Sequence, residues 1–100
     1  NSNTAMRKGP ILGVAIRGLN DAELSQLGIK GGVLIQDVNR GGLAAQSKIM
    51  PGDVVTQING KKVLNVNEFV EAVAELKNNT VARVTVIRAG QPAIIGLRIQ

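Results

Sequence analysis

The core of this chain has to be built almost entirely from branched aliphatic side chains. Its 100 residues include 12 valines and 10 isoleucines, whereas Phe69 is the only aromatic residue. Valine and isoleucine are restricted at χ1 and pack well on a pleated surface, so they favour strands. A chain of this length has room for one domain with one core. The composition therefore predicts a single, sheet-rich module.

Glycine, proline and asparagine divide the apolar residues into short runs, which predict strands rather than long helices. The expected strands are residues 11–16, 33–38, 54–58, 82–88 and 93–99. After the third of them, Asn59-Gly60 predicts a tight type I′ turn that returns through residues 61–63. The last two strands are expected to be joined by residues 89–92.

Three segments carry helix signals. Residues 20–28 begin with an Asn or Asp cap and end at Gly28, and residues 43–49 form a second short candidate between glycines and a proline. The longest pattern follows Asn65 as N-cap and has apolar residues at helical spacing: Val66, Phe69, Val70, Val73 and Leu76. The expected order is β-α-β-α-β-β-α-β-β, an α+β fold, mainly β, with a small, partly open sheet or barrel and two main helices.

The residue types that are missing exclude most catalytic sites from these residues. The chain has no histidine and no cysteine, so it holds no Ser-His-Asp triad, no thiol nucleophile and no thiolate or imidazole metal site. A serine–lysine dyad would need Ser47 and Lys48, whose neighbouring side chains do not face each other. We therefore expect no catalytic residue, metal or cofactor. No apolar run approaches the roughly 18 residues that span a bilayer, so no membrane insertion is expected.

The basic charge makes nucleic acid the first partner to weigh. Twelve Lys and Arg stand against seven Asp and Glu, which gives a net charge of +5. The cations are dispersed, however, and no Tyr or Trp offers a stacking platform, so a solvated surface is favoured over nucleic-acid binding. The small, polar start of the chain resembles a cleaved expression tag, so residues 1–8 are interpreted as a tag remnant or linker and residues 9–100 as the domain.

The segment from Gly42 to Gly60, with its Ala44-Ala45 pair, Pro51-Gly52-Asp53 turn and Asn59-Gly60 hairpin, resembles the signature of a PDZ domain. The placement of Leu12-Gly13-Val14 near the start is similar to the circularly permuted PDZ domains of bacterial HtrA/Deg-type, DegP-like periplasmic serine proteases, most of all their second, C-terminal one. The resemblance implies a five- to six-stranded PDZ fold capped by two helices. One departure is Lys48, which stands where the family commonly has a glycine with positive φ. Either the turn differs here or Lys48 is strained by about 1 kcal/mol.

The resemblance implies a peptide groove in which an extended ligand adds to a strand edge. Backbone N–H groups of Leu12, Gly13 and Val14 would hold a terminal carboxylate. The strand and the long helix would supply the rest of the groove, through Ala15, Ile16, Phe69, Val73 and Leu76. Alternatives stay open from the residues alone: Gly13 can simply relieve a bulge, and an apolar helix stripe is more often core. Arg7 and Lys8 lie close to the loop but are more easily explained as solvated.

The function implied is that of a noncatalytic module of a serine endopeptidase, which binds hydrophobic C-termini or extended segments of unfolded proteins in periplasmic protein quality control. One alternative is that the module serves oligomer assembly, through contacts with other subunits or PDZ domains of the same protease. Another places it in a different bacterial protein, such as a secretion-system scaffold or an intramembrane protease.

Overall fold

A computed structural model describes residues 12–99 and shows strands and helices in the expected order. The predicted tag or linker at residues 1–8, and Ile11 of the first expected strand, lie outside the described residues. The elements are β1 (Val14–Gly18), α2 (Asp21–Leu27), β2 (Val33–Val38), α3 (Leu43–Gln46), β3 (Val54–Ile58), β4 (Lys61–Lys62), α4 (Val66–Ala74), β5 (Thr80–Arg88) and β6 (Gln91–Ile99).

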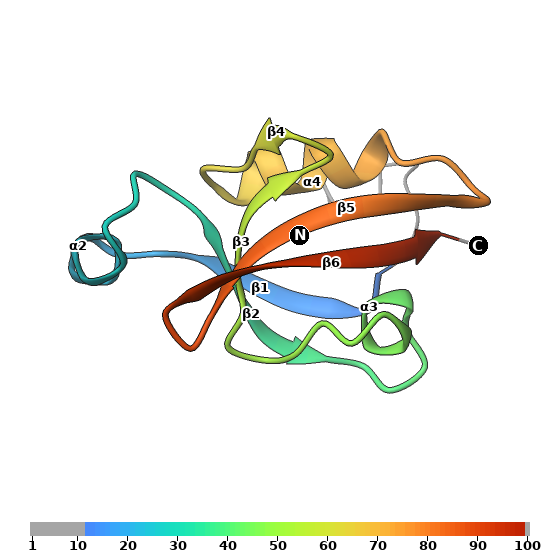
Figure 1. Ribbon diagram of the computed structural model, residues 1–100, viewed down its shortest axis with the longest axis horizontal. Coiled ribbons are helices and arrows are strands. Elements are labelled where there is room, and N and C mark those ends of the chain that lie inside the picture. Colours follow the sequence, from blue (N-terminus) through green and yellow to red (C-terminus); the bar gives the residue numbers. More distant parts are fainter. Residues whose placement is uncertain (1–11, 100) are drawn as a thin grey trace.

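The strands form one antiparallel, open sheet, as predicted (Figure 1). Its order is β1-β2-β3-β5-β6, and the short β4 pairs with β3 beside this path. Three helices accompany the sheet in the described part of the chain, since α2 is a formed helix in addition to α3 and α4. The sheet therefore ends in two edge strands, β1 and β6. No helix of the described residues is long and apolar enough to cross a membrane.

The first strand begins three residues later than its apolar run predicts. Gly13 has φ +76°, a left-handed conformation that interrupts an extended strand. Pairing with β2 therefore starts at Val14, opposite Val38, and continues to Gly18, opposite Val33, with a shift in register between Ala15 and Ile16. The expected bounds of this strand, residues 11–16, are wrong at both ends, because hydrophobicity does not reveal where the backbone turns.

The final hairpin is tighter than expected. Ala89 and Gly90 both have positive φ, 53° and 78°, as a two-residue type I′ turn requires. Arg88 then pairs with Gln91, so Gln91 and Pro92 belong to β6 and not to the loop over residues 89–92. The type I′ turn predicted at Asn59-Gly60 is confirmed, because these residues have φ 53° and 81°.

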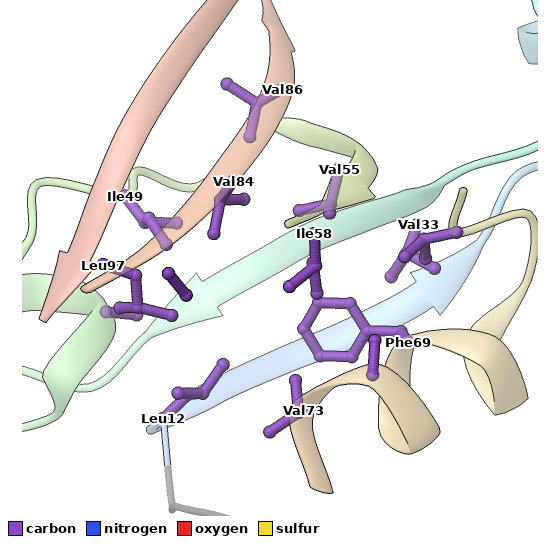
Figure 2. Close-up of a cluster of buried hydrophobic side chains, with 14 of the residues drawn as sticks. Leu12, Val33, Ile49, Val55, Ile58, Phe69, Val73, Val84, Val86 and Leu97 are labelled. Atoms are coloured by element: carbon purple, nitrogen blue, oxygen red, sulfur yellow. The ribbon is translucent and has the colours of Figure 1, made fainter. Parts of the chain in front are cut away.

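The core lies between the sheet and α4 and is aliphatic apart from one ring. Figure 2 shows the Phe69 ring extending from α4 toward Ile58 among the buried aliphatic side chains. The helix also buries Ala72 and Val73, and α3 buries Ala44. Leu12, Ile49 and Val63 enter the core from connecting segments. The sheet contributes the remainder: Val33, Ile35, Val55, Ile58, Ala82, Val84, Val86, Leu97 and Ile99.

The one buried charged side chain of the described residues, Asp53, is fully engaged. It is 1% exposed and accepts hydrogen bonds from Nε and Nη2 of Arg88, at 2.9 and 2.6 Å, and from the Met50 N–H at 3.0 Å. The same guanidinium donates to the Lys48 carbonyl at 3.0 Å. Lys48 has φ +71°, so the chain adopts the strained conformation here and Arg88 helps to hold it.

Replacing the Arg88 guanidinium is expected to destabilise the fold strongly. In Arg88→Met the Asp53 carboxylate stays buried without its partner, which should lower the free energy of unfolding by about 2 kcal/mol or more. Urea unfolding followed by circular dichroism measures this loss. The matched control is Arg83→Met, which removes a cation from an exposed position of the same strand. Equal losses of unfolding free energy in the two variants would contradict the stabilising role of the Arg88–Asp53 pair.

Candidate functional site

The outer edge of β1 is open to strand addition. The Gly13 carbonyl accepts a hydrogen bond from the Asn39 N–H at 2.8 Å, which places Gly13 at a position bonded to the β2 side. Hydrogen bonding alternates along an antiparallel strand, so the N–H and C=O groups of Val14 and Ile16 face away from β2. Within the described residues no strand pairs with this edge, because β1 ends the sheet.

The opposite edge of the sheet is obstructed at two positions. The Arg98 N–H donates to Ser47 Oγ at 3.1 Å, so Arg98 faces away from β5 and the alternate residues Gly96, Ile94 and Pro92 do as well. Pro92 has no N–H to offer, and Ser47 already occupies the Arg98 N–H. Of the two edges, β1 is therefore the better suited to pairing with an added strand.

The loop before β1 presents N–H groups that no backbone carbonyl of residues 12–99 accepts. Both of its carbonyls point into the protein: the Leu12 carbonyl accepts from the Ala44 N–H at 3.1 Å and the Gly13 carbonyl accepts from Asn39. The N–H groups of Leu12 and Gly13 donate to no backbone carbonyl within residues 12–99. Successive N–H groups around a left-handed residue form a concave site for an anion. The arrangement is suited to a carboxylate.

Two glycines allow this loop to lie directly on the start of α3. A Cβ on Gly13 would lie 3.0 Å from the Gly42 Cα, and a Cβ on Gly42 would lie 2.5 Å from the Leu12 carbonyl oxygen. Neither distance tolerates a side chain without movement of the backbone. The loop position is thus fixed by backbone contact, which gives Gly13 a structural role. Its role in holding a carboxylate stays a prediction.

The predicted apolar wall divides into a buried and an accessible part. Phe69 and Val73 are 5% and 9% exposed and belong to the core cluster, together with Leu12. Three further predicted residues are only partly buried against that cluster and keep accessible surface: Val14, Ile16 and Leu76. A ligand would touch the second set, whereas the first set supports it from below. Ala15 is exposed, as expected for a residue whose side chain alternates to the other face of β1.

Two further apolar residues of α4 keep accessible surface. Val66 and Val70 are half-buried and lie four residues apart on one helix face. Both were part of the apolar pattern that predicted the helix, but periodicity does not say which stripe packs into the core. The sequence contains both pairs of apolar residues. Only the burial of Phe69 and Val73 in the structure distinguishes them from Val66 and Val70.

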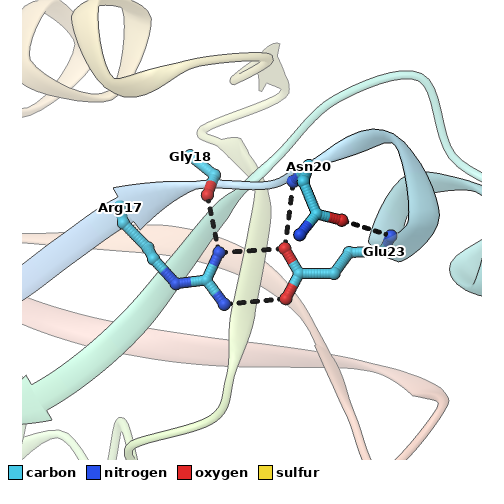
Figure 3. A network of polar contacts seen from close by, with 4 residues as sticks. All are labelled: Arg17, Gly18, Asn20 and Glu23. Atoms are coloured by element: carbon cyan, nitrogen blue, oxygen red, sulfur yellow. Dashed lines mark hydrogen bonds and ion pairs between the residues drawn. The ribbon is translucent and has the colours of Figure 1, made fainter.

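A polar network at the other end of β1 fixes α2 (Figure 3). Arg17 donates from its two terminal nitrogens to the Glu23 carboxylate at 2.9 and 2.7 Å, and also to the Gly18 carbonyl. Glu23 in turn accepts from the Asn20 N–H, while the Asn20 side chain accepts from the Glu23 N–H. This capping box and bidentate ion pair define what we term the α2 clamp: Arg17, Asn20 and Glu23. The sequence predicted the cap at the start of this helix, but not the ion pair between Arg17 and Glu23.

The Glu23 carboxylate of the α2 clamp should take up a proton only in strong acid. The hydrogen bond from Arg17, followed by that from the Asn20 N–H, lowers the pKa of Glu23 from 4.5 to about 2. Because the folded pKa is below the unfolded one, the stabilisation is complete above about pH 4.5 and is lost as the pH falls toward 2. NMR titration of the Glu23 side-chain carbon should show this low pKa. In Arg17→Gln the pKa should rise, and an unchanged value would contradict the pairing.

A single added methyl group should disturb the loop at one glycine and not at its neighbour. Gly42→Ala places Cβ against the Leu12 carbonyl, so we expect a loss of about 2 kcal/mol in the free energy of unfolding and shifted amide signals at residues 12–14. Gly41→Ala is the control, because nothing lies within 4 Å of a Cβ there and its cost should stay within about 0.5 kcal/mol. Equal stability of the two variants would refute the close packing.

Comparison with known proteins shows which chains this one resembles. The chain is 35% identical over 88 residues to a probable periplasmic serine endoprotease DegP-like of Pseudomonas fluorescens, and 38% identical over 88 residues to one of Hahella chejuensis. Each match covers 88% of this chain but only 18% and 19% of the relatives. The chain therefore spans about a fifth of the length of these curated relatives.

Solved structures show the same fold. The HtrA-type protease AlgW with a decapeptide matches with a TM-score of 0.76 and 26% identity, over 92% of this chain and 29% of that one. The HtrA3 PDZ domain bound to a phage-derived ligand matches with a TM-score of 0.73 over 87% of this chain and 81% of that one, at 18% identity. The family pattern of the PDZ domain matches residues 10–97. As the sequence resemblance predicted, this chain belongs to the PDZ domain family.

Proposed function

We propose that this chain is a noncatalytic peptide-binding module that recognises hydrophobic C-termini. The observation that carries the proposal is the junction of the open strand edge at Val14 and Ile16 with a loop in which the N–H groups of Leu12 and Gly13 donate to no backbone carbonyl within residues 12–99. A ligand strand would pair with the outward groups of Val14 and Ile16 while its terminal carboxylate binds the loop. The two solved HtrA-type relatives that carry peptides support this mode.

Selectivity would come from side chains next to the edge. The last ligand side chain would lie against the accessible apolar surface of Val14, Ile16 and Leu76, above buried Phe69 and Val73. Burying an aliphatic side chain there contributes roughly 1.5–3 kcal/mol, whereas a charged one would be desolvated without a partner. The site therefore favours an aliphatic C-terminal residue with a free carboxylate.

The curated relatives suggest the setting. They are named periplasmic serine endoproteases, so the longer protein would be an HtrA-type serine endopeptidase of the periplasm, and this module would hold unfolded substrate proteins for it. Extended chains with exposed apolar residues are what protein quality control has to recognise. Binding by main-chain pairing suits such varied substrates, because it requires an extended backbone rather than one sequence.

Assembly is the second candidate, and one surface favours it. The outer face of the β5–β6 hairpin carries Val81 and Ile94, which are 62% and 68% exposed. Apolar side chains at such exposure occur at contacts between proteins. In that case other subunits or PDZ domains of the same protease would be the partners, and the groove would be inactive.

An amide-shift NMR titration with paired peptides tests the proposal. Two acetylated hexapeptides ending in valine, one with a free carboxylate and one with an amide, differ only in the charge offered to the loop. We expect the acid to shift residues 12–16, Val70 and Leu76 and to bind roughly tenfold or more tightly than the amide, because charge-assisted hydrogen bonds are lost. No shifts with either peptide would favour assembly instead.

A further inference from the structure

The turn at Asn59-Gly60 is chemically reactive as well as tight. Asparagine followed by glycine is the pair of residues most prone to deamidation, because glycine has no side chain to hinder attack by its own backbone nitrogen. Both residues are exposed, and nothing lies within 4 Å of a Cβ at Gly60, so water reaches the turn freely. Every other asparagine of the chain precedes a residue with a side chain. Asn59 is therefore the asparagine at which this reaction is expected.

Deamidation proceeds through a cyclic imide. The backbone nitrogen of Gly60 loses its proton and attacks Cγ of Asn59, so that a new N–Cγ bond forms, the Cγ–Nδ2 bond breaks and the proton leaves with ammonia. Water then opens the imide at one of its two carbonyl carbons. Opening at Cγ gives aspartate, whereas opening at the backbone carbonyl gives isoaspartate, in which the main chain passes through Cγ. The first step requires Cγ to present its carbonyl face to the Gly60 nitrogen.

In the folded domain, β5 holds Asn59 by both its backbone and its side chain. The Asn59 N–H donates to the Arg83 carbonyl at 2.7 Å, and Asn59 Oδ1 accepts from the Arg83 N–H at 2.8 Å. The side chain thus takes the place of a backbone carbonyl and extends the strand pairing one residue beyond Ile58, which lies opposite Val84. The Gly60 N–H donates to no backbone carbonyl of residues 12–99. The restraint therefore acts on the side chain that is attacked, and rotation of that side chain gives up the bond to Arg83.

The two products fit the hairpin differently. An aspartate at position 59 has the same length and still offers a carboxylate oxygen to the Arg83 N–H, in a charge-assisted hydrogen bond. Isoaspartate adds one methylene group to the main chain, so a two-residue type I′ turn can no longer join the strands. The returning strand β4 is only two residues long, Lys61–Lys62, and has little pairing to lose before it separates.

We propose that Asn59 is a deamidation site that the fold keeps closed, and that it reacts when the β3–β4 hairpin separates from β5. The co-reactant is water, and isoaspartate is the product that the hairpin does not tolerate. Closure depends on the anchoring of β4, and Val63 supplies it: this residue is 0% exposed, and its N–H donates to the Thr56 carbonyl at 2.9 Å. The rate of deamidation then follows the population of the open hairpin.

Incubation at mildly alkaline pH, followed by mass spectrometry of the digested protein, tests the closed state. We expect residue 59 to react at least about tenfold more slowly in the folded protein than in the same protein unfolded in urea. Val63→Ala, with its folded state verified by circular dichroism, should react several-fold faster than the unmodified protein. Val81→Ala is the matched control, because it truncates an exposed valine of β5 and should leave the rate unchanged. Equal rates in the folded and unfolded protein, or an unchanged rate in Val63→Ala, overturn the proposal.

The products are tested separately. Asn59→Asp carries the aspartate product and should unfold at the same urea concentration as the unmodified protein. The isoaspartate form, made in urea and refolded, should unfold at a lower urea concentration and show shifted amide signals at residues 58–63. A protease that cleaves before aspartate but not before isoaspartate distinguishes the two forms. An isoaspartate form as stable as the unmodified protein would overturn the claim that the hairpin does not tolerate this product.

Discussion

The backbone contact between Gly13 and Gly42 is the constraint on which the site depends. It seats the loop before β1 on the start of α3, where the Leu12 carbonyl accepts from the Ala44 N–H. The segment that follows α3 continues the chain of contacts, because Ser47 covers the edge of β6 and the Lys48 carbonyl accepts from Arg88, the partner of buried Asp53. The loop before β1 is thus connected in a few steps to the buried carboxylate of Asp53. The helix α3, although only four residues long, joins them.

The sequence predicts those elements whose burial follows directly from their pattern. The strands over residues 33–38 and 54–58 match the structure at both ends, since each is a run of core residues bounded by turns. The prediction fails where a backbone conformation sets the boundary of a strand. The left-handed Gly13 displaces the start of β1, and the two-residue turn at Ala89 extends β6 to Gln91. The Arg17–Glu23 pair joins a strand to a helix six residues further along, a geometry that no helical or strand periodicity reveals.

On the long helix, periodicity identifies the apolar residues but not their use. Phe69 and Val73 fill the core, while Val66, Val70 and Leu76 keep accessible surface. The buried and the accessible residues both have helical spacing, so only the side on which the helix packs against the sheet distinguishes them. This division has a mechanical consequence. The accessible wall of the candidate groove is the outer part of a close-packed core, so it cannot move without disturbing Ile58 and its neighbours. That wall is therefore preorganised.

The two ends of the open edge are stabilised by different physics. At the N-terminal end of β1, the loop and α4 are held by backbone contact and aliphatic packing, which respond little to salt or acid. At the C-terminal end, α2 is held by a partly exposed ion pair and two caps, which are screened by salt and weakened in acid. Elements with few buried contacts open most easily, so local fluctuation should concentrate at α2. The open edge of β1 therefore joins a rigid end, at the loop before it, to a more adaptable end at α2, and this gradient follows from which end of β1 adjoins the core.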